Sequence, residues 1–206
     1  KDKTEIAGRM IREIDPQIEV ELITTPLESE KAFDAIKAGD VVLSGFDHDG
    51  PRFILNELCV AYDKPLIDMA SDVLEAGVYG GRVAVVKKDH GCLYCMGLLD
   101  MEDVRKYLTP GEQIENEAAV YGVGKEYLKQ DTGPSVISIN GVVASLGITE
   151  FMAMVTGMRE PFRLINYYGH TGKIIHSKDI LMEKCLYCQN RIAGRKAEVE
   201  RYIKQE

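Results

Sequence analysis

The stretch from Asp40 to Ser71 reads DVVLSGFDHDGPRFILNELCVAYDKPLIDMAS. Its apolar run Val41–Leu43 predicts a short buried strand, and the apolar residues of 53–61 recur at helical spacing. Pro65 ends that helix, and Leu66–Ala70 predicts the next strand. The pattern indicates a strand–helix–strand unit with a polar turn at the carboxyl end of its first strand.

The polar turn of this unit, residues 45–51, is a candidate ligand site. In open α/β sheets ligands bind at the carboxyl ends of the strands, so Asp47 is a candidate to bind magnesium beside a nucleotide phosphate. The alternative role is a helix N-cap or turn aspartate, for which Asp49 competes. Arg52 falls in the first turn of the following helix, where a solvated or paired charge is the simplest interpretation.

The flanking sequence predicts an α/β fold in which a mostly parallel sheet is flanked by helices, Rossmann-like but incomplete. We expect one domain over residues 1–206, with a mobile crossover segment at 100–132. Helices are predicted at 3–14, 28–38, 101–108, 114–128, 134–158 (long and buried on all sides) and 191–204, and strands at 17–24 and 80–86. Residues 162–168 and 173–176 predict a small antiparallel hairpin around 169–172.

Composition limits the class of protein. The chain has 206 residues, of which 45% are hydrophobic and 28% charged, typical of a globular domain. A net charge of -8 without a long basic run argues against nucleic acid as the main partner. No uninterrupted apolar run approaches the about 18 residues of a membrane span, so we expect no membrane partner and a cytoplasmic protein. The chain starts at Lys1 and not at Met, which leads us to expect a fragment.

Four of the five cysteines form two pairs, Cys92/Cys95 and Cys185/Cys188, and both read Cys-Leu-Tyr-Cys. Two such pairs supply the four soft ligands of a tetrahedral zinc ion, so we predict a structural zinc site. A redox dithiol, an iron centre and unligated thiols are the alternatives. A full set of four cysteines leaves no open position for catalysis. Cys59 lies in the apolar helix, where we expect it to be a small buried hydrophobe.

Together these parts resemble the ThiF/MoeB/HesA family of ubiquitin-activating-enzyme-like adenylyltransferases, from Lys3 to about Cys188. Lys3-Thr4-Glu5 with Ile14-Asp15-Pro16 is similar to the family's K-x-E … I-N-P stretch. The cysteine pairs are similar to its zinc knuckles. The other matching segments are Asp40-Val41-Val42-Leu43 … Phe46-Asp47-His48 … Arg52 … Asn56 … Cys59 (D-x-V-x-x-x-T-D-N … R … N … C), Pro65-Leu66-Ile67, Gly81-Arg82-Val83 and Gly133-Pro134 with the helix after it.

The sequence also departs from the family pattern. Phe46 replaces Thr and His48 replaces Asn around Asp47, and no glycine-rich phosphate loop of the form GxGxxG occurs in the 206 residues. We therefore expect the C-terminal two-thirds of a ThiF-like adenylation domain, which lacks the N-terminal nucleotide-binding part.

The resemblance implies ATP-dependent adenylation of the C-terminal carboxylate of a small ubiquitin-like, sulfur-carrier-type protein or peptide. Asp47 would then bind magnesium, Lys3 would face the phosphates of ATP, and Arg52 would support the site. Residues 96–184 contain no cysteine, which favours adenylation without a thioester. Family members are commonly dimers, so we expect a homodimer through the apolar helix at 134–158.

Two other functions stay open. A non-catalytic partner subunit or scaffold that docks a ubiquitin-like protein agrees with the missing phosphate loop and with the unusual Phe46-Asp47-His48. A zinc-stabilised peptide-binding module that uses the 162–176 hairpin is the third.

Overall fold

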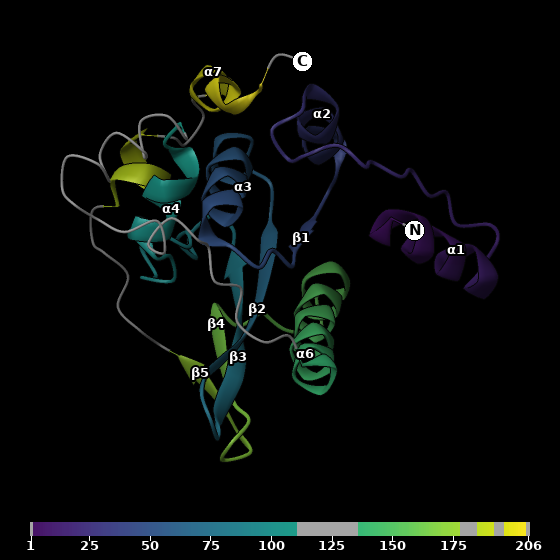
Figure 1. The fold of residues 1–206 in the computed structure, drawn as a ribbon, viewed down its shortest axis with the longest axis vertical. Coiled ribbons are helices and arrows are strands. Elements are labelled where there is room, and N and C mark those ends of the chain that lie inside the picture. The colour runs from purple at the N-terminus through teal and green to yellow at the C-terminus, as the bar shows by residue number, and fades with distance from the viewer. Residues whose placement is uncertain (1, 111–135, 178–184, 192–195, 205–206) are drawn as a thin grey trace.

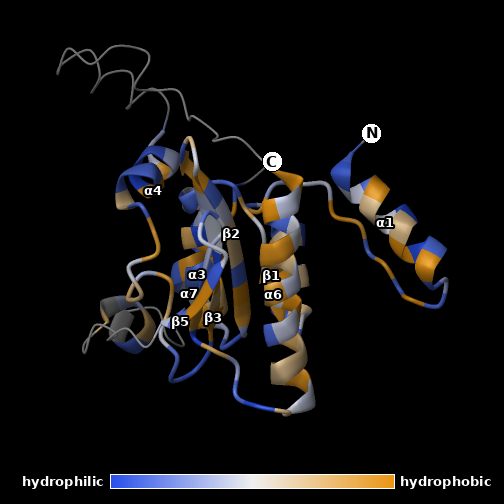
Figure 2. Cartoon of the chain, turned by 90° about the horizontal axis from the view of Figure 1, so that it is seen from below, coloured by the Kyte–Doolittle hydropathy of each residue, from blue (hydrophilic) through white to orange (hydrophobic). Residues whose placement is uncertain are grey.

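The structure, a computed structural model, describes residues 2–110, 136–177, 185–191 and 196–204 (Figure 1). Its centre is a five-stranded sheet in the order β1-β2-β3-β4-β5. Helices α3 and α4 cover one face of the sheet and α6 covers the other, while α1 lies apart from the sheet (Figures 1 and 2). This layered arrangement confirms the predicted α/β class.

The strand–helix–strand unit predicted from 40–71 is present. It consists of β1 (Val42–Ser44), α3 (Asp49–Ala61) and β2 (Leu66–Glu75). β1 and β2 pair in parallel, with Val42 opposite Leu66. Nearly every residue of α3 is buried, because the sheet lies on one side of the helix and later segments of the chain cover the other.

The rest of the described sheet is antiparallel, so the prediction of a mostly parallel sheet holds only for the β1–β2 pair. β3 (Val78–Val86) returns directly beside β2 through a tight turn at Gly77, whose φ is +86°. So short a turn can join only antiparallel strands. The predicted hairpin is confirmed as β4 (Leu164–Tyr168) and β5 (Lys173–Ser177), which extend the sheet beyond β3.

The predicted helices at 3–14, 28–38 and 101–108 are confirmed as α1 (Lys3–Ile14), α2 (Glu30–Ala38) and α4 (Met101–Leu108). The strand predicted at 17–24 is wrong, because those residues pair with no strand among the described ones. An alternating sequence suits a sheet, but a strand also needs a neighbour that takes up its backbone hydrogen bonds. The second predicted helix, at 114–128, and most of the 100–132 crossover lie outside the described residues.

The long apolar helix is confirmed as α6 (Ile137–Thr156), but the prediction that it is buried on all sides is wrong. One stripe faces the sheet, and the opposite side is exposed. The buried residues are Ile139, Val143, Gly147, Glu150 and Ala153. The large exposed apolar residues include Ile137, Ile148, Met152 and Val155. α6 also has the length and composition of a membrane span, which is weak support for one because core helices of soluble proteins share these properties.

In the described part of the C-terminal segment, the continuous helix predicted for 191–204 is replaced by short helical turns, and residues 192–195 lie outside the described ranges. The described parts of this segment are η2 (Leu186–Arg191), α7 (Lys196–Val199) and η3 (Glu200–Tyr202). The buried carboxylate of Glu57 in α3 accepts hydrogen bonds from Arg201 at 2.8 Å and from the Tyr202 hydroxyl at 2.7 Å. These bonds attach the end of the chain to the outer side of α3.

Candidate functional site

The turn between β1 and α3 presents Asp47 to solvent at the carboxyl end of β1. Its carboxylate makes no hydrogen bond or ion pair with another described residue. The position is the edge at which α/β sheets bind ligands. An exposed carboxylate without a protein partner is available to a cation that arrives from solvent.

The role of a turn aspartate is filled by Asp49. Its backbone amide donates to the Asp103 carboxylate at 2.8 Å, and its own carboxylate accepts from the backbone amide of Asp100 at 2.7 Å. These reciprocal bonds join the N-terminal ends of α3 and α4. The N-cap of α3 is His48, which makes no side-chain capping bond. Asp47 therefore does not serve as the N-cap of α3.

Arg52 is a paired and buried charge, with 7% of its surface exposed. One terminal nitrogen of its guanidinium donates to the carbonyl oxygens of Phe46 and, at 3.4 Å, of Met69. The other terminal nitrogen donates to Asp49 at 3.2 Å, and Nε lies 3.5 Å from a carboxylate oxygen of Asp68. Arg52 thus joins the turn that contains Asp47 to α3 and β2. Its charge is paired inside the protein and does not face solvent.

The sequence analysis missed two charged residues of this region, Asp68 in β2 and Arg82 in β3. Asp68 is fully buried, and Arg82 Nη2 lies 3.9 Å from its carboxylate and donates to the carbonyl oxygen of Leu98 at 2.7 Å. Burial lowers the pKa of Arg82, and the charge of Asp68 opposes that shift. The available signal was one charged residue within each of the apolar stretches Leu66–Ala70 and Arg82–Val86, at positions that the alternation of a strand places on the α3 face.

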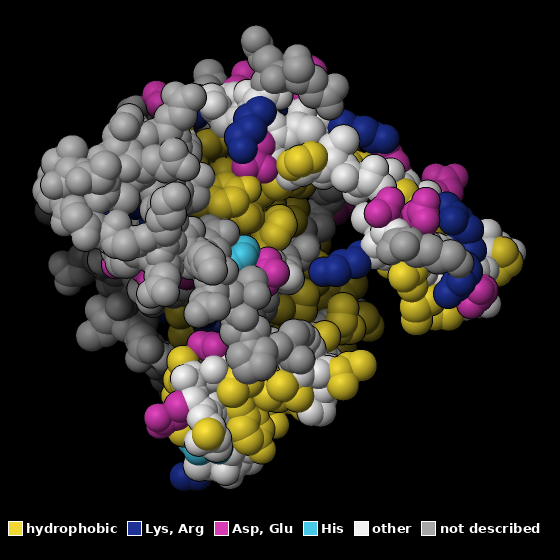
Figure 3. All heavy atoms as spheres, in the orientation of Figure 1, with side chains coloured by type: hydrophobic (Ala, Val, Ile, Leu, Met, Phe, Trp, Pro, Cys, Tyr) yellow, Lys and Arg dark blue, Asp and Glu magenta, His cyan; other side chains and the backbone are white. Residues whose placement is uncertain are grey.

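Lys3 is exposed on α1, and no hydrogen bond or ion pair joins it to Asp47 among the described residues. Figure 1 shows α1 beyond β1, away from the sheet. In Figure 3 the surface is hollowed between the α1 region and the rest of the molecule, with apolar side chains at its floor. Of the three predicted residues, the structure brings together Asp47 and Arg52, while Lys3 stays separate from both.

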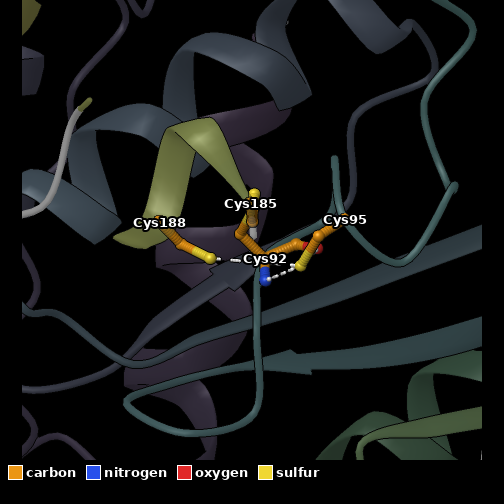
Figure 4. A group of neighbouring side chains, drawn as sticks. All are labelled: Cys92, Cys95, Cys185 and Cys188. Atoms are coloured by element: carbon orange, nitrogen blue, oxygen red, sulfur yellow. Dashed lines mark hydrogen bonds between the residues drawn. The ribbon is translucent and has the colours of Figure 1, made fainter. Parts of the chain in front are cut away.

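The four paired cysteines meet in one cluster (Figure 4). Cys92 and Cys95 lie in the loop after β3, and Cys185 and Cys188 lie at the start of η2 and within it. All four sulfur atoms lie within 4.8 Å of one another, with Cys92 to Cys185 at 3.8 Å and Cys95 to Cys188 at 4.0 Å. The cluster joins segments far apart in the sequence.

The spacing of the sulfur atoms fits a metal ion better than a disulfide. A disulfide needs sulfur atoms about 2 Å apart. Four thiolates around one zinc ion, each about 2.3 Å from it, lie about 3.8 Å from one another. The measured 3.8 and 4.0 Å are close to that value, and all the cysteines are free. The donor set and its geometry therefore fit a structural metal ion.

Hydrogen bonds within the cluster favour a thiolate at Cys95. The bond from the Cys92 thiol is the largest of the effects that lower the pKa of Cys95 to about 5, and the Cys92 backbone amide also donates to its sulfur at 3.1 Å. The same contact raises the pKa of Cys92, and burial raises that of Cys188 to about 12. Cysteines that bind a metal ion are thiolates. A bound cation would therefore stabilise the thiolate form of Cys92 and Cys188, whose pKa values are raised without it.

Side chains around the cluster position both knuckles. The buried Asn56 of α3 accepts a hydrogen bond from the backbone amide of Leu93 at 2.9 Å. Tyr94 and Tyr187, which occupy the same place in the two Cys-Leu-Tyr-Cys sequences, pack with ring centroids 4.4 Å apart. Phe53 of α3 contacts Tyr187 edge-on at 5.5 Å. The cluster is thereby built onto α3, the helix that begins at the Asp47 turn.

Cys59 is fully buried in the same core and does not belong to the cluster. Burial raises the pKa of its thiol to about 12. A neutral, inaccessible thiol is not a nucleophile. This agrees with the prediction that Cys59 is a core hydrophobe.

The fold and the cluster define an α/β domain whose C-terminal segment is joined to the sheet by four cysteines. A family model matches residues 1–197, and the chain belongs to the ThiF family. This confirms the resemblance seen in the motifs.

Curated relatives agree with the family. The chain is 34% identical over 188 residues to a probable molybdopterin-synthase adenylyltransferase of Porphyra purpurea, covering 88% of this chain and 43% of the relative. It is 27% identical over 113 residues to the sulfur carrier protein ThiS adenylyltransferase of Escherichia coli, covering 54% and 43%. Protein HesA of Leptolyngbya boryana is 23% identical over 155 residues, covering 75% and 46%. The chain spans somewhat less than half the length of these relatives.

Solved structures share the fold. The crystal structure of E. coli MccB with MccA-N7isoASN has a TM-score of 0.65 at 17% identity and covers 91% of this chain and 52% of MccB. MccB with ATP has a TM-score of 0.63 at 17% identity, with 91% and 51% covered. SeMet PaaA has a TM-score of 0.55 at 13% identity, with 86% and 55% covered.

Proposed function

We propose that this protein catalyses the ATP-dependent adenylation of the C-terminal carboxylate of a small ubiquitin-like, sulfur-carrier-type protein or peptide. The observation that carries the proposal is the exposed, unpartnered Asp47 at the carboxyl end of β1 in a ThiF-family chain. Relatives named as adenylyltransferases of molybdopterin synthase and of ThiS support the reaction class. The fold shared with MccB, which has been solved with ATP and with the peptide MccA, is consistent with it.

In this reaction a carboxylate oxygen of the carrier attacks the α-phosphorus of ATP. The bond from that phosphorus to the bridging oxygen breaks, pyrophosphate leaves with the electron pair, and the product is an acyl-adenylate. No protein nucleophile is needed, so the enzyme positions the two substrates and neutralises negative charge. Cys59 is buried and neutral and so does not serve as a nucleophile, which favours adenylation without a thioester.

The residues of this chain would have separate roles. Asp47 would bind the magnesium ion that arrives with ATP, because its carboxylate is exposed and unpartnered. Arg52 would hold the turn in place, through its bond to the Phe46 carbonyl. Lys3 would face the phosphates, for which its exposed side chain is free of hydrogen bonds and ion pairs with other described residues.

We also propose that the cysteine cluster binds zinc. A bound zinc ion would be structural, because all four positions of a tetrahedron are taken by Cys92, Cys95, Cys185 and Cys188. The residues themselves hold the C-terminal segment to the loop after β3 and to α3. The support is the sulfur spacing and the lowered pKa of Cys95.

The test is exchange of labelled pyrophosphate into ATP, with the full-length natural protein and candidate ubiquitin-like carriers. Asp47→Asn should lower exchange by about 100-fold or more, the scale of losing a group that stabilises transition-state charge. Zinc content and thermal stability should not change, because Asp47 is exposed and its carboxylate makes no hydrogen bond or ion pair with another described residue. Cys59→Ala, a matched core variant, should keep exchange. Wild-type exchange in Asp47→Asn would overturn the assignment of Asp47.

The alternative function is a non-catalytic partner subunit or scaffold that docks a ubiquitin-like protein. It is favoured by the missing phosphate loop in the 206 residues and by Phe46 and His48 in place of the family's Thr and Asn. If the protein binds a carrier but gives no exchange with any carrier that it binds, this alternative replaces the enzyme. A peptide-binding module centred on the 162–176 hairpin would require β5, whose residues are mostly exposed, to bind peptide without ATP.

We further propose a homodimer in the cytoplasm, with no nucleic-acid or membrane partner. The exposed apolar side of α6 supports the dimer, since Ile148 and Met152 are 48% and 42% exposed and Val155 is 52% exposed. Contiguous apolar surface of this kind marks an interface. The only charged residue of α6, Glu150, is buried against the body of the protein and forms an ion pair with Arg159.

A further inference from the structure

A buried carboxylate lies directly beneath the turn that contains Asp47. Asp68 is opposite Ser44, the last residue of β1, and is therefore next to the point where the turn begins. Asp68 is fully buried, and neither of its oxygens makes a hydrogen bond among the described residues. Two guanidinium groups are its nearest charges, with Arg52 Nε at 3.5 Å and Arg82 Nη2 at 3.9 Å.

The two arginines use their remaining nitrogens differently. Arg52 donates to the Phe46 carbonyl, one residue before Asp47. Arg82 donates to the Leu98 carbonyl at 2.7 Å, in the segment before α4, and makes no hydrogen bond or ion pair with the turn among the described residues. Only Arg52 therefore connects the charge of Asp68 to the backbone beside Asp47.

The burial of Arg52 and the partial burial of Arg82 depend on a nearby negative charge. A buried cation is tolerated when it is paired and its hydrogen bonds are satisfied. Asp49 also pairs with Arg52, from the helix side of the guanidinium at 3.2 Å. If Asp68 lost its charge, the remaining attraction would draw Arg52 toward Asp49, at the edge of the fold, and away from the Phe46 carbonyl.

We propose that Asp68 is a positioning residue for Asp47: it holds Arg52 against the Phe46 carbonyl and so fixes the turn that presents the Asp47 carboxylate. The proposal rests on the proposed function of Asp47 as a magnesium ligand. Partners one step removed from a metal ligand commonly change metal affinity or activity by about 10- to 100-fold, because they set the orientation of the ligand.

The first test measures the turn directly and needs no activity. Hydrogen–deuterium exchange is followed in peptides that cover 45–53, with residues 139–153 of α6, on the opposite face of the sheet, as the internal reference. Asp68→Asn should speed exchange in 45–53 and leave 139–153 near the wild-type rate. Equal acceleration of both regions would show general loss of stability and would overturn the positioning role, as would no change in 45–53.

The second test measures the magnesium concentration that gives half-maximal pyrophosphate exchange, in the full-length natural protein. Asp68→Asn should raise it by about tenfold or more. Arg52→Met should do the same, and the double variant should be no worse than Arg52→Met alone, since both act through one contact. Additive effects in the double variant would overturn the proposal.

The matched control is Arg82→Met. It removes the other cation beside Asp68 but leaves the Arg52–Asp68 pair and the bond to Phe46 in place. The half-maximal magnesium concentration should stay within about twofold of wild type, even if the variant is less stable. A shift as large as that of Asp68→Asn would mean that the buried cluster as a whole, and not the path through Arg52, controls the turn.

The two tests separate this inference from the proposed function. If the wild-type protein shows no pyrophosphate exchange but Asp68→Asn still loosens residues 45–53, the proposed function fails and the structural path from Asp68 to the turn stands. If exchange is normal and magnesium-dependent in wild type but neither measurement changes in Asp68→Asn, the proposed function stands and the positioning role of Asp68 is wrong.

Discussion

The two faces of the sheet are covered by helices of different character, and the less apolar helix, α3, is the more buried. On one face, α3 is almost entirely buried, and charged contacts, the cysteine cluster and the C-terminal turns surround it. On the other face, α6 packs only through one stripe, and Ile148, Met152 and Val155 are exposed. The burial of a helix therefore depends on which other segments pack against it, and not on its composition alone.

The largest expected effect is on the α3 face, where the cysteine cluster joins the loop after β3 to the C-terminal segment. Cys92→Ser should abolish metal binding and lower the free energy of unfolding by about 3 kcal/mol or more, because the metal cross-link between distant segments is lost. Elemental analysis and thermal denaturation measure the two effects.

Cys59→Ala is the control for that experiment, because Cys59 is buried in the same core but lies outside the cluster. It should keep about one equivalent of zinc. Absence of zinc from the wild-type protein, or full metal content in Cys92→Ser, would contradict the assignment.

The next effect concerns the ion pair between Glu150 of α6 and Arg159, which follows the helix. Glu150 is 1% exposed and accepts from Arg159 at 2.8 and 2.6 Å and from the Phe162 amide at 2.8 Å. Glu150→Ala should cost about 2–3 kcal/mol, because the Phe162 amide loses its acceptor and the Arg159 guanidinium loses its carboxylate partner and keeps only the Glu160 carbonyl as a hydrogen-bond acceptor among the described residues. Urea denaturation measures the loss, and a change below about 0.5 kcal/mol would show that water replaces the carboxylate.

A substitution on the exposed side of α6 should change stability less than the preceding ones but should change the oligomeric state. Ile148→Glu should convert the proposed dimer to a monomer and change monomer stability by less than about 0.5 kcal/mol, because the side chain is half exposed. Light scattering at micromolar concentration measures the mass. Met101→Glu, an exposed apolar residue of α4 on the other face, is the control and should not alter the mass.

Two outcomes of the α6 experiment would count against the dimer. If the wild-type protein is a monomer, the exposed side of α6 does not bind a second copy of the chain. Recruitment of the wild-type protein, but not of Ile148→Glu, to neutral lipid vesicles would instead favour a membrane-facing role for α6, whose length and composition permit one.

The last effect concerns the pH dependence of stability on the α3 side of the sheet. Burial raises the pKa of Glu28, but the hydrogen bonds from Tyr107 (2.6 Å), its own backbone amide and Lys204 outweigh it, and the net pKa is lowered from 4.5. A lowered folded-state pKa means that this contribution to stability is present above pH 4.5 and is lost as the pH falls through the folded-state value.

Tyr107→Phe should therefore destabilise the protein by about 1 kcal/mol at pH 7, and the difference from wild type should shrink below pH 4. Urea denaturation at both pH values measures it. A difference that grows on acidification would mean that Glu28 is not the partner through which Tyr107 acts.

Much of the fold and part of the candidate site could be predicted from local sequence. The unit around β1, α3 and β2 was predicted because its apolar periodicity changes from strand to helix and back within 32 residues, between Asp40 and Ser71. The cysteine cluster was predicted because both pairs have the same spacing and composition. In each case the signal lies in residues close together in the chain.

The remaining features depend on contacts between distant segments, which no local pattern contains. Residues 17–24 have the alternation of a strand but no neighbour to pair with, and α6 has an apolar surface that only one face of the sheet meets. The charged cluster of Arg52, Asp68 and Arg82 required three elements to come together. Local sequence therefore accounts for the elements and for the four candidate metal-ligating cysteines, whereas the burial of Arg52 and Asp68 follows from the tertiary structure, because burial depends on the neighbours that folding brings.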